Sequence, residues 1–212
     1  MGAKTQPLGQ KRFTPPSAGF LRDHPSCSLQ TLVGRNRGGS LRHLVVRGRK
    51  HRVFSALRED GSSPAIEMLA LLQKGWWLPD SDHNDDEGWP DTRQADDRLK
   101  LLQQIQRFAD TGTAAGRHQF NFLEMGIWEF KRTGKRISFY DTDGAGNYCT
   151  EKPNVREEDC SRPGDPQWWI PDFEPQLRLG HSFAKTGQKT ERHDIEEAHI
   201  VREEDLTRDR AA

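Results

Sequence analysis

Cysteine is scarce in this chain of 212 residues, which contains only Cys27, Cys149 and Cys160. An odd number of cysteines without closely spaced pairs argues against a disulfide framework and against a cysteine-based zinc site. No run of residues approaches the roughly 20 apolar residues of a membrane-spanning helix, and the chain start lacks the ~7–15-residue apolar segment of a secretory signal peptide. We therefore expect a cytoplasmic protein that has no membrane partner.

Apolar side chains are also few. They make up 33% of the chain, charged residues make up 30%, and the mean hydropathy is -0.92. A chain of this length commonly forms one domain, but so polar a composition predicts a core that does not use the whole length. The net charge is zero but uneven, because residues 1–50 carry ten Lys and Arg side chains against one acid, Asp23.

Residues 1–50 are rich in Gly, Pro, Ser and Arg and show no sustained hydrophobic period. This composition is typical of disorder, so we predict a basic, disordered tail over 1–50 and an ordered domain over 51–212. The tail's charge suits RNA or an acidic partner, although such tails are usually solvated. Two polar stretches, about 75–95 and 144–175, are predicted to be irregular insertions. The first is acidic but lacks the spacing of a Ca²⁺ loop, and we predict no metal and no cofactor.

The ordered domain is predicted to alternate strands and helices. The predicted order is a strand over 51–57, a helix over 63–75, a helix from Asp96 or Asp97 to Gly112, a hairpin over 126–143, a strand over 177–185 and a helix after Thr190. Helical spacing of apolar residues, capping residues and terminal glycines support the helices. The order predicts an α+β fold, in which a small antiparallel-rich sheet packs under helices on one side.

The hairpin is the strongest local signal in the chain. Its sequence, GIWEFKRTGKRISFYDTD, places two alternating runs on either side of Thr133-Gly134, and a two-residue loop with Gly second is typical of a hairpin turn. Period-two geometry then separates an apolar face from a polar one. The apolar face holds Trp128, Phe130, Ile137 and Phe139, and the polar face holds Glu129, Lys131, Arg136, Ser138 and Tyr140.

On the polar face, Lys131 is predicted to lie directly opposite Arg136. Two like charges in a cross-strand pair cost free energy unless an anion or an acidic group lies between them. The polar face is therefore a candidate phosphate-binding site, and the alternative is a face that is simply solvated.

Three stretches resemble the RelE/ParE superfamily of bacterial toxins, and specifically its phage-derived HigB-type branch. RVFSALREDGSSPAIEML is similar to the family's first strand, Gly-x-Ser-Pro turn and first helix. GIWEFKRTGKRISFYD is similar to its "WELR … yRvly" hairpin, and HSFAKTGQKT followed by ERHDIEEA is similar to its "FvKKTqKTP … elA" ending. The three occur in the family's order and cover most of residues 52–206 outside the insertions.

The resemblance implies a microbial ribonuclease (RelE-like) fold and metal-free, ribosome-dependent cleavage of mRNA. It also implies a cognate antitoxin, which we expect to be a small helix-turn-helix protein. Lys131, Arg136, Lys185 and Lys189 match the basic residues of the family motifs.

The implied chemistry needs cations beside a phosphate, because fixed charges stabilise the negative charge that develops in the transition state. Arg136 is the best clamp for two phosphate oxygens. Lys131 and Lys185 add charge, and His181 and Tyr140 are the candidates for proton transfer. The remaining candidate RNA contacts are Arg132, Lys135 and Lys189.

Other interpretations stay open at this point. Tyr140 is equally suited to packing at the sheet edge, and alternation with Leu179 and Phe183 favours a core position for His181 unless Gly180 shifts the register. The sequence also departs from the family, with Thr186 in place of the second Lys of "KKT" and acid-rich insertions. The second hypothesis is therefore a non-catalytic homologue that binds an antitoxin or another regulator.

Overall fold

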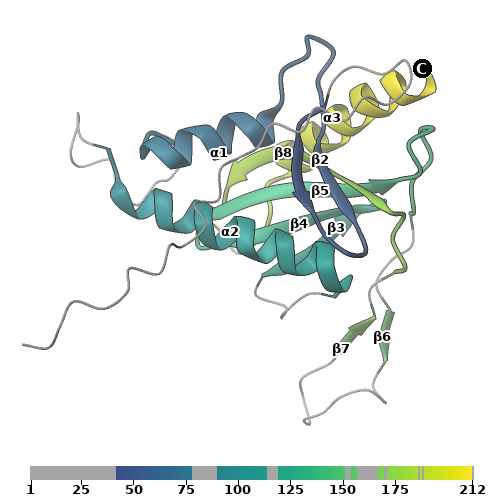
Figure 1. The fold of residues 1–212 in the computed structure, drawn as a ribbon, viewed down its shortest axis with the longest axis horizontal. Coiled ribbons are helices and arrows are strands. Elements are labelled where there is room, and N and C mark those ends of the chain that lie inside the picture. Colours follow the sequence, from purple (N-terminus) through teal and green to yellow (C-terminus); the bar gives the residue numbers. More distant parts are fainter. Residues whose placement is uncertain are drawn as a thin grey trace, which may run out of the picture. The chain divides into compact units, whose positions relative to one another are not determined.

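The protein has an α+β fold in which three helices cover a six-stranded, mostly antiparallel open sheet (Figure 1). A computed structural model describes residues 42–77, 90–113, 119–150, 154–156, 167–169, 171–185, 187 and 189–211. These residues belong to one unit, Thr31–Ala212. Among them, no helix is both long enough and apolar enough to cross a membrane.

The sheet has the strand order β1-β2-β8-β5-β4-β3. Its strands are β1 (Leu44–Arg47), β2 (Arg52–Ser55), β3 (Phe120–Glu124), β4 (Ile127–Arg132), β5 (Lys135–Thr142) and β8 (Gln176–Ala184). β2 and β8 run parallel, whereas all the other neighbours in this sheet are antiparallel. β6 (Asn154–Arg156) and β7 (Gln167–Trp169) form a separate antiparallel pair inside the second predicted insertion.

The predicted hairpin is confirmed with its register. Trp128 pairs with Phe139, Phe130 with Ile137, and Lys131 with Arg136. The apolar face lies in the main core, where the Phe130 and Phe139 rings stack with centroids 4.3 Å apart. Alternation along both strands therefore places the polar face on the opposite side of the sheet.

Helices α1 (Pro64–Lys74) and α2 (Thr92–Thr111) pack together over the apolar face (Figure 1). α1 begins with Pro64 and ends at Gly75, whose φ of 75° suits a residue without Cβ, as predicted. The predicted start of α2 at Asp96 or Asp97 is wrong. Asp91 caps this helix by accepting a hydrogen bond from the Arg93 N–H, which lies in the first turn where N–H groups lack helical partners.

The third helix corrects the expectation that the helices pack on one side. α3 (Arg192–Arg210) contributes Val201 and Leu206 to a second cluster with Ala56 and Tyr140. Tyr140 follows Phe139, which lies in the main core, so its side chain points to the opposite face. The sheet is therefore covered on both faces.

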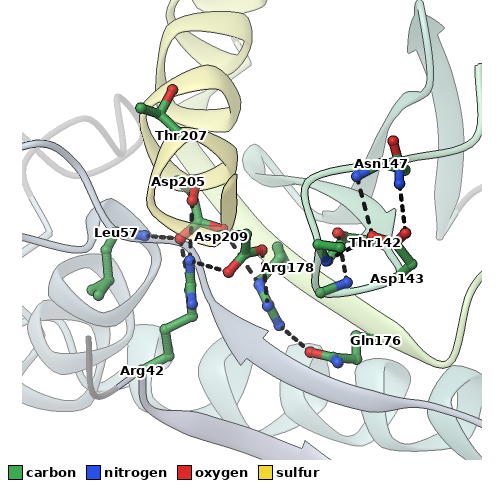
Figure 2. A network of polar contacts seen from close by, with 12 residues as sticks. Arg42, Leu57, Thr142, Asp143, Asn147, Gln176, Arg178, Asp205, Thr207 and Asp209 are labelled. Atoms are coloured by element: carbon green, nitrogen blue, oxygen red, sulfur yellow. Dashed lines mark hydrogen bonds and ion pairs between the residues drawn. The ribbon is translucent and has the colours of Figure 1, made fainter. Parts of the chain in front are cut away.

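A buried ionic network fastens α3 to the sheet (Figure 2). Asp205 Oδ1 accepts hydrogen bonds from Arg42 Nε at 2.8 Å and from the Leu57 N–H at 2.9 Å. Asp209 pairs with Arg42 and with Arg178. The four charged groups alternate in sign, which offsets part of the free-energy cost of burying them.

The predicted boundary at residue 50 is also wrong. β1 pairs with β2, and Arg42 is buried against α3, so the fold includes residues on the N-terminal side of that boundary. β1 was not predicted because its apolar stretch is short and lies within a segment whose composition is basic. The rest of the predicted tail, residues 1–41, lies outside the described residues.

The predicted insertions contain core residues at their ends. Trp77 and Phe173 are both buried in the main cluster, and the Trp77 N–H donates to Gln94 Oε1. Residues 78–89 and 157–166 lie outside the described residues.

Candidate functional site

Four charged side chains lie near one another at the turn end of the β4–β5 hairpin. Lys131 and Arg136 are a cross-strand pair. Glu129 lies on the same face as both, and Lys185 follows β8, whose end pairs with Lys135 of β5. The charges of Arg136, Lys185 and Lys131 all act on the Glu129 carboxylate. One carboxylate therefore stands among three cations, which leaves an excess of two positive charges.

Glu129 is completely buried, with 0% of its surface exposed. Its Oε1 accepts a hydrogen bond from Asn121 Nδ2 at 3.3 Å, and its Oε2 lies 3.8 Å from Arg136 Nε. Burial raises the pKa of Glu129, whereas the charges of Arg136, Lys185 and Lys131 oppose that shift. The residue supplies the acidic group that a Lys–Arg cross-strand pair needs.

Backbone carbonyls fix the Arg136 guanidinium. Its Nη1 donates to the carbonyl oxygens of Thr133 and Lys135, each at 2.7 Å. Thr133 has a φ of 51°, a strained conformation for a β-branched residue, and its carbonyl is one of these acceptors. Nη1 is thereby held by the backbone, whereas Nε has no hydrogen-bond partner among the described residues. Only 11% of the Arg136 side chain is exposed.

Lys185 reaches the cluster because the end of β8 runs beside the hairpin turn. Its backbone N–H donates to the Gly134 carbonyl at 2.7 Å. This hydrogen bond follows directly after the Lys135–Ala184 pair, toward the hairpin turn. Lys185 is partly exposed, whereas Lys189, four residues later, is exposed. Of the basic residues that the resemblance singles out, Lys131, Arg136 and Lys185 therefore converge.

His181 lies on the same side of the sheet as the cluster because β8 contains a bulge. Ile137 pairs with Ser182 but Phe139 pairs with Leu179, so β8 has one extra residue in this interval. This is the register shift at Gly180 that the sequence left open. A Cβ on Gly180 would lie 2.9 Å from Ser138 Oγ, so the close approach of the two strands requires glycine.

The bulge turns His181 toward α3. Its Nε2 lies 3.4 Å from Asp194 Oδ1, and its ring stacks on Phe183 with centroids 5.6 Å apart. Burial lowers the pKa of His181, and Asp194 opposes that shift in part. The imidazole is therefore mainly neutral near pH 7, which is the state that accepts a proton.

Tyr140 does not belong to this cluster. It is 1% exposed, and its hydroxyl donates to Asp205 Oδ2 at 2.8 Å within the ionic network under α3. Burial raises the pKa of Tyr140 well above its usual value, and the negative charge of Asp205 acts in the same direction. Its expected catalytic role is replaced by a structural one.

Arg132 and Lys135, two of the expected RNA contacts, both pair with Asp97 of α2. Arg132 Nε lies 3.0 Å from Asp97 Oδ1, and Lys135 Nζ lies 2.9 Å from Asp97 Oδ2. The Lys135 side chain is 3% exposed, so this charge is committed to the pair. Arg132 remains partly exposed.

Sequence reasoning missed Glu129 and Asp194 as site residues. Glu129 had a usable signal, because alternation places it on the face of Lys131 and Arg136, next to the like-charged pair. Asp194 had none, since its contact with His181 depends on where α3 crosses the sheet.

Comparison of the chain with protein-family models found no match, and comparison with curated proteins found no significant match. Within the described residues, no three His, Cys, Asp or Glu side chains form a group that could hold a metal ion.

Proposed function

We propose that this protein is the toxin of a type II toxin–antitoxin pair and a ribosome-dependent endoribonuclease that acts on translated mRNA. The observation that carries the proposal is the convergence of Arg136, Lys131 and Lys185 around one carboxylate. Its excess of positive charge suits a phosphodiester group, and its residues are the ones that the family resemblance implies. The proposed enzyme uses no cofactor, acts in the cytoplasm and is neutralised by a small helix-turn-helix antitoxin.

The proposed reaction needs charge neutralisation and two proton transfers. The 2′-hydroxyl oxygen bonds to the adjacent phosphorus, and the bond from phosphorus to the 5′-oxygen breaks. The products are a 2′,3′-cyclic phosphate and a 5′-hydroxyl. The Arg136 guanidinium, Lys131 and Lys185 would stabilise the negative charge on the phosphoryl oxygens, which is commonly the largest catalytic contribution.

His181 is the candidate for proton transfer. It shares a face of β8 with Phe183, which pairs with Arg136 across the strands. Its lowered pKa favours the neutral imidazole, and Asp194 orients the ring. A neutral imidazole takes the 2′-hydroxyl proton, and the imidazolium that results can return a proton to the 5′-oxygen.

A second candidate function is non-catalytic binding of an antitoxin or another regulator. The specific observation that favours it is burial: Glu129 is fully buried, Arg136 is mostly covered, and Tyr140 is enclosed beneath α3. A homologue that has lost activity could keep these residues as structural ion pairs alone.

The test is a reconstituted translation reaction with the purified full chain and a 5′-labelled mRNA. The nuclease proposal predicts fragments ending in a 2′,3′-cyclic phosphate, dependent on ribosomes and lost in His181→Ala and Arg136→Ala. Intact mRNA in the presence of folded wild-type protein would reject it in favour of the binding protein.

A further inference from the structure

A second cationic feature lies between α2 and the turn end of β4. It is a hollow of about 570 Å³ lined by Lys100, Gln103, Gln104, Arg107, Gln119, Lys131, Arg132 and Thr133. β3 begins only at Phe120, and Lys131 N–H donates to the Gln119 carbonyl beside the hollow. The hollow therefore opens at the edge of the sheet where the β3 ladder has ended.

The lining residues that the structure describes include four cations and no acid. Two of the cations have carboxylate partners just outside it: Lys100 pairs with Asp96, and Arg132 pairs with Asp97. Among the described residues, the four lining cations outnumber these two carboxylates, in a chain whose net charge is zero. A concave surface of one charge sign concentrates ligands of the opposite sign.

The other lining groups indicate which kind of anion fits. Glutamine amides and a threonine accompany the cations, and no apolar or aromatic side chain is among the lining residues that belong to the described part of the chain. Protein partners usually anchor in interfaces through apolar and aromatic side chains. Arg, Lys, Gln and Thr side chains are instead typical of contacts with phosphate and sugar oxygens.

Lys131 connects the hollow with the hairpin cluster, because it lines the first and stands opposite Arg136 in the second. We propose that the hollow binds the phosphodiester backbone of single-stranded RNA, one or more nucleotides away from the phosphate held at Arg136. This site rests on the proposed function, since it gives the same RNA substrate a second contact surface. Apart from Lys131, the residues of the hollow set how much RNA the protein holds and take no part in the cleavage step.

The test uses 2′-O-methyl oligouridines, which lack the attacking hydroxyl, and the purified full chain. Lys100→Gln with Arg107→Gln should weaken binding of an RNA of about twelve nucleotides by about tenfold and reduce the slope of log affinity against log salt by about 1.4. Binding of a dinucleotide should change less than about twofold, because it reaches only the hairpin cluster. Lys74→Gln, an exposed cation in the last turn of α1, is the matched control and should leave both affinities unchanged.

Equal weakening for the long and short RNA, or no weakening for either, would overturn the proposal. So would tighter binding of an acidic peptide, such as oligoglutamate, through the same two cations. The outcome is separable from that of the proposed function. RNA affinity can depend on Lys100 and Arg107 whether or not mRNA is cut, and cleavage can depend on Arg136 whether or not the hollow binds RNA.

Discussion

Glu129 Oε2 and Arg136 Nε lie 3.8 Å apart, and both atoms are buried without a hydrogen-bond partner among the described residues. At that separation the two groups attract each other but do not complete a hydrogen bond. The pair is thus held in place by its surroundings, and an anion at the guanidinium would compete with Glu129 for the same charge.

Glu129→Gln should therefore strengthen anion binding. Removing one negative charge beside Arg136, Lys131 and Lys185 should raise the affinity for a 2′-O-methyl RNA by on the order of tenfold at pH 7. Because the pKa of Glu129 is raised, the wild type should also bind more tightly as the pH falls toward that pKa and the carboxyl group becomes neutral. The variant should lose this dependence. Fluorescence anisotropy between pH 5 and 8 checks both, and weaker binding by a folded Glu129→Gln protein would contradict the arrangement.

Tyr140→Phe should leave activity unchanged and reduce stability. The substitution removes the hydrogen bond to Asp205, which should cost about 1–2 kcal/mol of unfolding free energy. Urea titration measures the loss, and the mRNA cleavage assay measures activity. If a folded Tyr140→Phe protein no longer cleaves mRNA, the Tyr140 hydroxyl has a catalytic role and this prediction is wrong.

Asp97→Asn should destabilise the protein because it leaves the buried Lys135 ammonium without its carboxylate. A loss of roughly 2–3 kcal/mol is expected, against less than about 0.5 kcal/mol for Asp96→Asn, whose pair with Lys100 is exposed. Urea titration of the adjacent variants makes a matched comparison, and similar losses for both would contradict the assignment.

The Asp97 carboxylate should also make the free energy of unfolding depend on pH in the acidic range. Burial alone would raise the pKa of Asp97, but Lys135 and Arg132 outweigh it and lower the pKa below its usual value. Its contribution to stability should be present above the unfolded pKa of about 4 and lost as the pH falls through the lower native pKa.

His181 predicts a pH dependence closer to neutrality. Burial lowers its native pKa, opposed by Asp194 and Glu197 of α3, while Arg58 lowers it further. Below about pH 6.5 the unfolded chain takes up a proton that the native state binds less readily, so the free energy of unfolding should fall as the pH drops from 7.5 toward 5.5. The free energy of unfolding of His181→Gln should fall less steeply over this range. Identical pH profiles for wild type and His181→Gln would contradict this assignment.

The sequence predicted local features well wherever one strand or one turn of helix determined them. The Thr133-Gly134 hairpin follows from alternation, the start of α1 from the preference for proline in the first helical turn, and the end of α1 from the conformation of Gly75. The pairing of Lys131 with Arg136 follows from the same register.

Features that depend on distant contacts were beyond those rules. Tyr140 has the same alternation whether it faces solvent or α3, and Asp205, its partner, is 65 residues away. Asp97 was predicted to cap a helix because it precedes an apolar repeat. In the structure its carboxylate instead accepts a hydrogen bond from Lys135 of β5. The sequence suggested a bulge at Gly180 as one of two possible registers. The packing of Gly180 against Ser138 and α3 determines which register forms.

The most direct test of the central claim is protein synthesis in cells after induction of the full chain or its Arg136→Ala variant. Arg52→Ala, an exposed strand arginine outside the cluster, serves as the control. If the nuclease site lies at the hairpin, the wild type and Arg52→Ala should stop incorporation of labelled amino acid, while folded Arg136→Ala should not. Arrest by Arg136→Ala equal to that of the wild type would contradict a nuclease site at the hairpin.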